Sequence, residues 1–257
     1  MMSTDTEGLV NIDDVDLYYK IVGNSGEPLL MIMGLSFSHL DWGDRIVSLL
    51  SQHYRVILFD NRDSGRSDTV TQPYNISQMA DDSAGLLSTL GVRKAHVFGV
   101  SMGGAIAQHL ALSHESKVNR LILGCTTADT EGLGALSPEA LAQPLGGLLF
   151  TPEYLEAHDT EIEAFIEDVS PYHSGPLALL RQLYAMGTHD TKSELDSISH
   201  ETLVITGDRD IVIPSGKSIE LDAGIPNSEL SIIDDAAHGF TYSHADESYN
   251  LIHNFLQ

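Results

Sequence analysis

Short apolar runs alternate along this chain with longer segments in which apolar residues recur at helical spacing. The runs predict strands at Leu9–Ile12, Val15–Val22, Leu29–Met33, Arg55–Phe59, Ala95–Phe98, Leu121–Leu123, Thr202–Thr206 and Leu230–Ile233. The helical spacing predicts helices at Trp42–Leu50, Ile76–Leu90, Gly104–Leu112 and Asp246–Leu256. Because strand and helix alternate, we expect an α/β fold with a mostly parallel central sheet flanked by helices.

The alternation stops between residues 126 and 191, where proline residues separate short helical pieces. The two longest pieces, Glu153–Val169 and Leu177–Met186, each carry an apolar stripe. The stripes consist of Leu155, Ile162, Phe165, Ile166 and Val169 on the first piece and of Leu177, Leu180, Leu183 and Tyr184 on the second. We therefore expect a small helical cap at 126–191, inserted into a core formed by 1–125 and 192–257. We expect the stripes to dock on this core; the alternative is that some of their residues line a substrate site.

The chain is strongly acidic, which limits its partners. It has 37 Asp and Glu against 13 Lys and Arg among 257 residues, a formal charge of −24. Such a field repels phosphate backbones and anionic headgroups, so we expect neither nucleic acid nor membrane as a partner. It favours neutral or cationic small molecules. A solvated surface that maintains solubility is sufficient to explain the acidity, and adaptation to salt is the alternative.

No export signal, cofactor motif or metal motif stands out. The segment Met1–Glu7 lacks the basic and apolar regions of a signal peptide, and no apolar run approaches the about 20 residues of a membrane span, so we expect a cytoplasmic protein. Cys125 is the single cysteine, cannot form an internal disulfide, and is interpreted as a small apolar residue at a strand end. There is no cysteine cluster, no His-Glu-x-x-His run, no Gly-x-Gly-x-x-Gly loop and no complete Walker-type phosphate loop, so we expect neither metal nor cofactor.

The pattern most specific for chemistry is Gly99-Val100-Ser101-Met102-Gly103, between a predicted strand and a predicted helix. A serine at a sharp strand-to-helix turn has strained backbone angles, and a glycine on each side relieves the crowding and leaves the hydroxyl exposed. We therefore predict Ser101 as a nucleophile. The amide of Met102 points at the same place from the positive end of the helix dipole, so we expect it to stabilise an oxyanion. A tight turn with no catalytic role is the alternative.

Two loops after late strands add an acid and a base. The first is Gly207-Asp208-Arg209-Asp210, and the second is Asp234–Gly239, which contains His238. A serine hydroxyl becomes nucleophilic when a base takes its proton, and a carboxylate holds that base in the right tautomer. We assign His238 as general base and then acid, and Asp210 as the orienting acid, with Asp208 as its alternative. We also considered three other histidines and assign them no catalytic role: His109, His114 and His244.

With serine, acid and histidine in this order, the chain resembles α/β-hydrolase-fold enzymes of the esterase and lactonase group, from Leu29 through the final helix. The segment Asp60–Ser67 is similar to the family's Asp-x-Arg-Gly-x-Gly-x-Ser loop, with Asp63 where glycine is usual. Met33-Gly34-Leu35 is similar to the family's His-Gly oxyanion loop, with Met33 in place of the histidine. The resemblance implies that the Leu35 amide is the second oxyanion donor beside that of Met102. This loop and Gly187–Asp190 are also similar to bacterial methylesterase-like hydrolases of the aclacinomycin type.

The resemblance implies acyl transfer, because relatives that displace halide or open epoxides have aspartate at the position of Ser101. We expect hydrolysis of a carboxylic ester or lactone through an acyl-enzyme intermediate. The predicted cap has few basic residues, chiefly Arg181 and Lys192, which favours an uncharged substrate. Carbon–carbon bond hydrolysis of ring-fission diketones, cofactor-free perhydrolysis and, from another class, a ligand receptor with slow turnover stay open. No residue is assigned to substrate binding.

Overall fold

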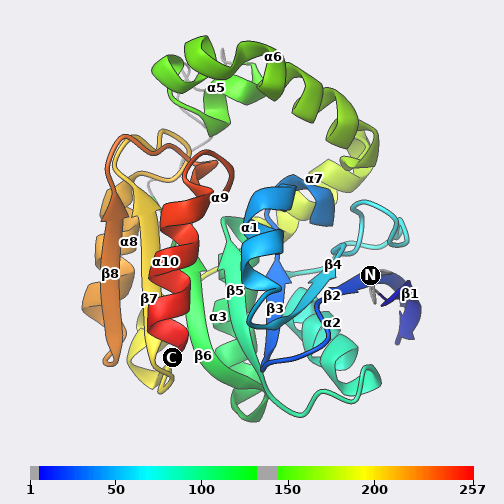
Figure 1. Cartoon of the computed structure of the whole chain (residues 1–257). Helices are drawn as coiled ribbons and strands as arrows, with labels where there is room; N and C mark the ends of the chain where they lie inside the picture. The colour runs from blue at the N-terminus through cyan, green and yellow to red at the C-terminus, as the bar shows by residue number, and fades with distance from the viewer. Residues whose placement is uncertain (1–5, 132–143) are drawn as a thin grey trace.

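The computed structural model describes residues 6–131 and 144–257, and its centre is an eight-stranded sheet (Figure 1). The strands are β1 (Thr6–Ile12), β2 (Val15–Val22), β3 (Pro28–Ile32), β4 (Arg55–Phe59), β5 (Ala95–Val100), β6 (Val118–Gly124), β7 (Thr202–Gly207) and β8 (Ser228–Ile233). They lie in the order β1-β2-β4-β3-β5-β6-β7-β8. β2 pairs antiparallel with both β1 and β4, and the remaining neighbours pair in parallel.

Helices cover both faces of the sheet, and each face has its own apolar cluster. In β3, Leu30 and Ile32 join one cluster while Leu29 and Met31 join the other, as the alternation of side chains along a strand requires. The first cluster packs against α2 (Ile76–Thr89), α3 (Met102–Ser113) and α8 (Ser215–Gly224), and the second against α1 (Asp44–Leu50) and α10 (Ala245–Leu256). Figure 1 shows α1 and α10 on the near face of the sheet. The predicted fold class is confirmed.

The remaining described elements are short or belong to the segment between β6 and β7. They are the 3-10 helices η1 (His39–Trp42), η2 (Glu115–Lys117), η3 (Ser170–Tyr172) and η4 (Lys192–Ser197), and the α-helices α5 (Leu145–Leu149), α6 (Pro152–Val169), α7 (Pro176–Met186) and α9 (Phe240–Ser243). Figure 1 shows α5 and α6 above the ends toward which the parallel strands point. Part of the predicted cap, residues 132–143, lies outside the described residues. Within the described ranges, no helix combines the length and the hydropathy that a membrane span requires.

The prediction that an apolar stripe docks α7 on the core is wrong. Leu177, Leu180, Leu183 and Tyr184 are 71%, 61%, 46% and 61% exposed, and α7 instead buries Ala178, Gln182 and Ala185. Two small side chains and one amide allow this helix to approach the core backbone closely, so its buried face is not its most apolar face. On α6, by contrast, Ile162 and Val169 of the predicted stripe are buried.

Candidate active site

Ser101 occupies the turn between β5 and α3. Its backbone has φ 55° and ψ −124°, and a positive φ is uncommon for a residue with a side chain. The flanking glycines make this turn sterically feasible: a Cβ on Gly99 would collide with the carbonyl of Gly103, and a Cβ on Gly103 would collide with that of Ile32. The Ser101 N–H donates to the carbonyl of Gly124 at 2.9 Å. The strained turn is thus held by β6 on one side and by close backbone packing on the other.

His238 and Asp210 come from the loops after β8 and β7 and are hydrogen bonded to each other. Nδ1 of His238 lies 2.7 Å from Oδ2 of Asp210. The other carboxylate oxygen accepts the N–H groups of Val212 at 2.8 Å and Ile213 at 2.9 Å. Asp210 is buried, whereas Asp208, the alternative acid, is exposed. The loop therefore directs Asp210, and not Asp208, at the imidazole.

The protonation of His238 is governed by opposing influences. Burial disfavours the imidazolium, but the charge of Asp210, the hydrogen bond to it and the nearby Cys125 outweigh the burial. As a result, the pKa of His238 is raised well above its ordinary value of 6.5.

The loop Met33-Gly34-Leu35 lies directly against Ser101. A Cβ on Gly34 would be 3.0 Å from Cβ and 3.5 Å from Oγ of Ser101, so glycine allows the loop to approach the serine. Leu35 and Ser101 line the same cavity. Met102 is the first residue of α3, and its N–H therefore has no acceptor within the helix. Both predicted donor residues are adjacent to the serine.

The cap side of the molecule is hydrogen bonded to the backbone that follows Leu35. Ser36 has φ 71°; its N–H donates to Oε1 of Gln182 at 2.7 Å, and its carbonyl accepts the N–H of Ser174 at 2.9 Å. Nε2 of His173 lies 2.8 Å from Oδ1 of Asp41, at the end of the same segment. Sequence patterns did not single out Gln182, Ser174, His173 or Asp41, because each pair is joined across more than a hundred positions.

Asp63, the departure from the family-like loop, adopts the left-handed conformation that suits glycine. Its φ is 68°, and aspartate tolerates this region better than most residues. Its buried carboxylate accepts two hydrogen bonds from Arg181, at 2.8 and 2.7 Å, and one from the Tyr74 hydroxyl at 2.9 Å. Arg181 is thus paired with a core carboxylate and does not line the cavity at Ser101.

The cavity at Ser101 has a volume of about 360 Å³ and a mainly apolar lining. Apolar side chains come from Met33, Leu35, Phe37, Val100, Cys125, Leu145, Leu148, Leu149, Phe150, Phe165, Leu179 and Val212; polar ones come from Ser36, Asp41, Ser101, His173, His238, Thr241 and Tyr242. Among the described residues, no Lys or Arg lines this cavity, and its one carboxylate is that of Asp41. None of His109, His114 and His244 reaches it. The cavity suits an apolar, uncharged group.

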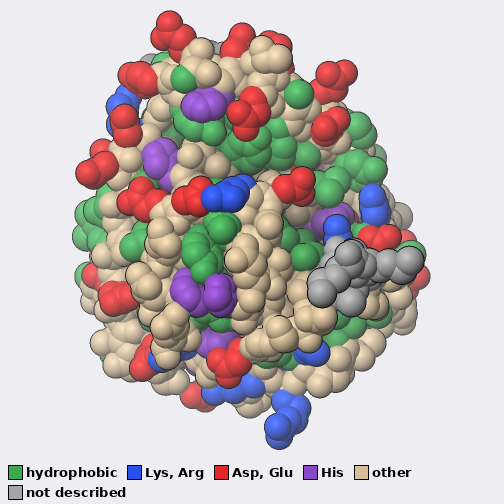
Figure 2. All heavy atoms as spheres, in the orientation of Figure 1, with side chains coloured by type: hydrophobic (Ala, Val, Ile, Leu, Met, Phe, Trp, Pro, Cys, Tyr) green, Lys and Arg blue, Asp and Glu red, His purple; other side chains and the backbone are tan. Residues whose placement is uncertain are grey.

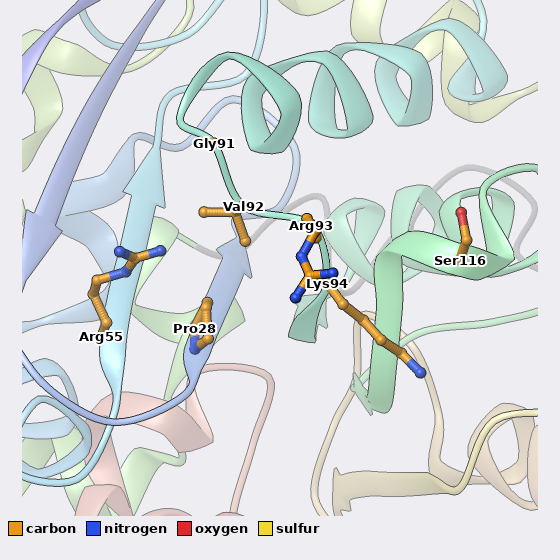
Figure 3. Close-up of a pocket in the computed structure, with 7 residues that line it drawn as sticks. All are labelled: Pro28, Arg55, Gly91, Val92, Arg93, Lys94 and Ser116. Carbon is orange, nitrogen blue, oxygen red and sulfur yellow. The ribbon is translucent and has the colours of Figure 1, made fainter.

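A second hollow, of about 460 Å³, lies at the opposite edge of the sheet, where β3 and β4 begin. Figure 3 shows the guanidinium groups of Arg55 and Arg93 on either side of Pro28 and Val92, with Lys94 extending away from them. Basic side chains gather at the lower edge of the face shown in Figure 2, whereas acidic ones surround its upper part. Among the described residues that line this hollow there is no His, Asp or Glu, so Ser116 has no imidazole beside it, and the cavity at Ser101 is the candidate active site.

Comparisons with known proteins bear on the family and the fold. A family model described as alpha/beta hydrolase fold matches residues 27–178. A putative carbamate hydrolase RutD of Azorhizobium caulinodans is 31% identical over 242 residues, which are 89% of this chain and 90% of that protein. A putative non-heme chloroperoxidase of Synechocystis sp. is 27% identical, over 98% of this chain and 99% of that protein. The enol-lactonase of Burkholderia xenovorans LB400 superposes with a TM-score of 0.86 at 26% identity, covering 97% and 99% of the two chains. The names of these relatives state different reactions.

Proposed function

Because this chain belongs to the alpha/beta hydrolase fold family, we propose that it is a serine hydrolase of a small, uncharged carboxylic ester or lactone, with Ser101, His238 and Asp210 as its catalytic triad. One observation carries the proposal. The imidazole of His238 is hydrogen bonded to a buried carboxylate at 2.7 Å and lines the same apolar cavity as the serine of the strained turn.

In the proposed reaction, Oγ of Ser101 attacks the substrate carbonyl carbon while His238 accepts the hydroxyl proton. The backbone N–H groups of Leu35 and Met102 donate to the oxyanion that forms. His238 then protonates the leaving oxygen, and an acyl group stays on Ser101. Water attacks this acyl-enzyme with the same histidine as base, which releases the acid and restores the hydroxyl. Asp210 keeps Nδ1 protonated and stabilises the imidazolium in both halves.

The character of the cavity supports an uncharged substrate. A carboxylate placed beside Asp41 would meet like charge and would find no Lys or Arg among the described lining residues. The cap helices provide leucine and phenylalanine side chains for an apolar acyl or alcohol group. Two relatives bear on the bond that is cleaved: the enol-lactonase favours a lactone, and the carbamate hydrolase favours a carbamate as the second candidate. A carbamate carbonyl would be attacked by the same groups.

A substrate panel tests this proposal. Short-chain nitrophenyl esters, uncharged lactones, aryl carbamates and a ring-fission diketone are offered to the wild type and to Ser101→Ala. We expect turnover of esters or lactones by the wild type, no turnover by Ser101→Ala, and the same melting temperature for both. Ser113→Ala, at the other end of α3, is the matched control and keeps full activity. A fluorophosphonate probe labels Ser101 alone.

Other outcomes separate the alternatives. Activity retained by Ser101→Ala, or labelling at another residue, contradicts the nucleophile assignment. Turnover of the carbamate or of the diketone in preference to every ester replaces the proposed substrate class. Ligand-dependent thermal shifts with negligible turnover of all substrates indicate a receptor instead of an enzyme.

A further inference from the structure

Cys125, which the proposed reaction does not use, lies beside the acid–base pair. It directly follows β6, is 1% exposed, and has φ 37°. Its N–H donates to the carbonyl of Ile205 at 2.8 Å, which ties it to β7. Its thiol donates to the backbone carbonyl of His238 at 3.6 Å. The sulfur is therefore held next to His238 by one backbone contact to β7 and one to the loop after β8.

Cys125, His238 and Asp210 together provide the donor set of a zinc site. One ligand atom from each residue, a sulfur, a nitrogen and an oxygen, lies within 4.8 Å of the other two. Tetrahedral zinc bonds of normal length place such atoms about 3.4 to 3.6 Å apart, so side-chain shifts on the order of 1 Å close the site. Cys125 and His238 both line the cavity, which gives an ion a route in and leaves the fourth position to water.

From this geometry we propose that Zn²⁺, or another thiophilic divalent cation, binds to Cys125, His238 and Asp210 and inhibits the enzyme. The net charge of −24 draws cations toward the protein, and the thiolate selects zinc over the more abundant Mg²⁺ and Ca²⁺. The coordination stands on the geometry alone, whereas the inhibition rests on the proposed function.

The binding step exchanges protons for a metal ion and involves no oxidation. Bonds form from zinc to Sγ of Cys125, to Nδ1 of His238 and to Oδ2 of Asp210. The thiol proton leaves to solvent, and neutral His238 changes tautomer: Nδ1 gives up the proton that it shares with Asp210, and Nε2 takes up one proton from solvent. An imidazole with a metal on Nδ1 has its remaining proton on Nε2, so it can no longer accept a proton from Ser101. Zinc binding therefore inhibits the proposed reaction, because it leaves His238 in a tautomer that cannot act as the base.

Cobalt(II) tests the coordination without relying on activity. Added to the apoprotein, it should produce a near-ultraviolet band of thiolate-to-cobalt charge transfer, and since the chain has 1 cysteine, the band reports Cys125. Zn²⁺ should remove the band by displacement. Cys125→Ser should abolish the band, and Asp210→Asn should weaken cobalt binding by at least about tenfold. His253→Gln is the control, because it alters a half-buried histidine on α10 that lines neither the cavity nor the proposed metal site, and it should leave the band unchanged.

Ester turnover tests the inhibition. Zn²⁺ should inhibit the wild type and His253→Gln alike, Mg²⁺ and Ca²⁺ should not inhibit, and Cys125→Ser should need at least about 100-fold more Zn²⁺ for half inhibition of its own rate. Absence of the band, or equal sensitivity of Cys125→Ser to zinc, overturns the site. A band with unaltered turnover, while Ser101→Ala is inactive, overturns the inhibition. A band together with an active Ser101→Ala supports the metal site and contradicts the proposed function.

Discussion

Replacement of Asp210 by asparagine isolates the orienting role of this carboxylate. In the structure, Oδ1 accepts two backbone N–H groups, from Val212 and Ile213, while Oδ2 faces Nδ1 of His238 at 2.7 Å. The amide oxygen of an asparagine must take the place of Oδ1, since the –NH₂ group cannot accept those bonds. The –NH₂ group then faces His238, and two donors cannot bond. The imidazole therefore places its proton on Nε2, where it cannot accept the proton of Ser101.

The expected loss follows from this tautomer. Triads with the wrong tautomer lose roughly 10⁴-fold in kcat, which corresponds to about 5 kcal/mol of transition-state stabilisation. KM should change little, because no contact to the substrate is removed. The assay is kcat and KM for the best ester of the panel, with Asp208→Asn as the control in the same loop. Asp208 is exposed, so its variant should retain nearly full activity. A greater loss in Asp208→Asn than in Asp210→Asn would refute the reasoning and move the role to Asp208.

Three further predictions concern pH, the cap and substrate charge. Since neutral imidazole is the active form in the proposed reaction and the pKa of His238 is raised above 6.5, kcat/KM should rise with pH through a midpoint above 6.5. The stabilisation of the fold by the His238–Asp210 pair is present at lower pH and should decline as the pH rises through the same interval. A kcat/KM midpoint below 6.5 contradicts this prediction. Arg181→Met should lower the free energy of unfolding, measured in urea, by about 3 kcal/mol, because it leaves the fully buried carboxylate of Asp63 without its cation. Adding Asp63→Gly should restore part of this loss. A double variant that is no more stable than Arg181→Met alone contradicts the prediction. A neutral ester should have a higher kcat/KM than its carboxylate-bearing analogue, because the acidic protein repels the carboxylate. The ratio of the two kcat/KM values should fall as the Debye length shortens from about 10 Å at 0.1 M salt to about 3 Å at 1 M. A higher kcat/KM for the analogue at both salt concentrations contradicts this prediction.

Local sequence patterns predicted most of the sheet because each strand buries a run of apolar residues. The predicted strand Arg55–Phe59 coincides with β4, and Ala95–Phe98 falls within β5. The same reasoning missed α8, in which the two buried residues are Ser218 and Leu221 while Ile219 is 49% exposed. It also assigned the wrong face of α7 to the core. Both failures have one cause: a helix that buries small or polar side chains has no apolar stripe to detect.

The candidate triad could be proposed from the sequence because each member lies in the loop that follows a predicted strand, so its position depends on a few neighbouring residues. The walls of the cavity have no such local determinant. Gln182 lies in a helix and Ser36 in a loop, 146 positions apart, and the hydrogen bond between them forms only when the cap segment is folded over the sheet. That bond holds the residue next to Leu35, one of the proposed oxyanion donors. Under the proposed function, a substitution that moves the cap should therefore act on the geometry of the oxyanion donors as well as on the shape of the pocket, so we expect specificity and rate to be coupled through the same backbone.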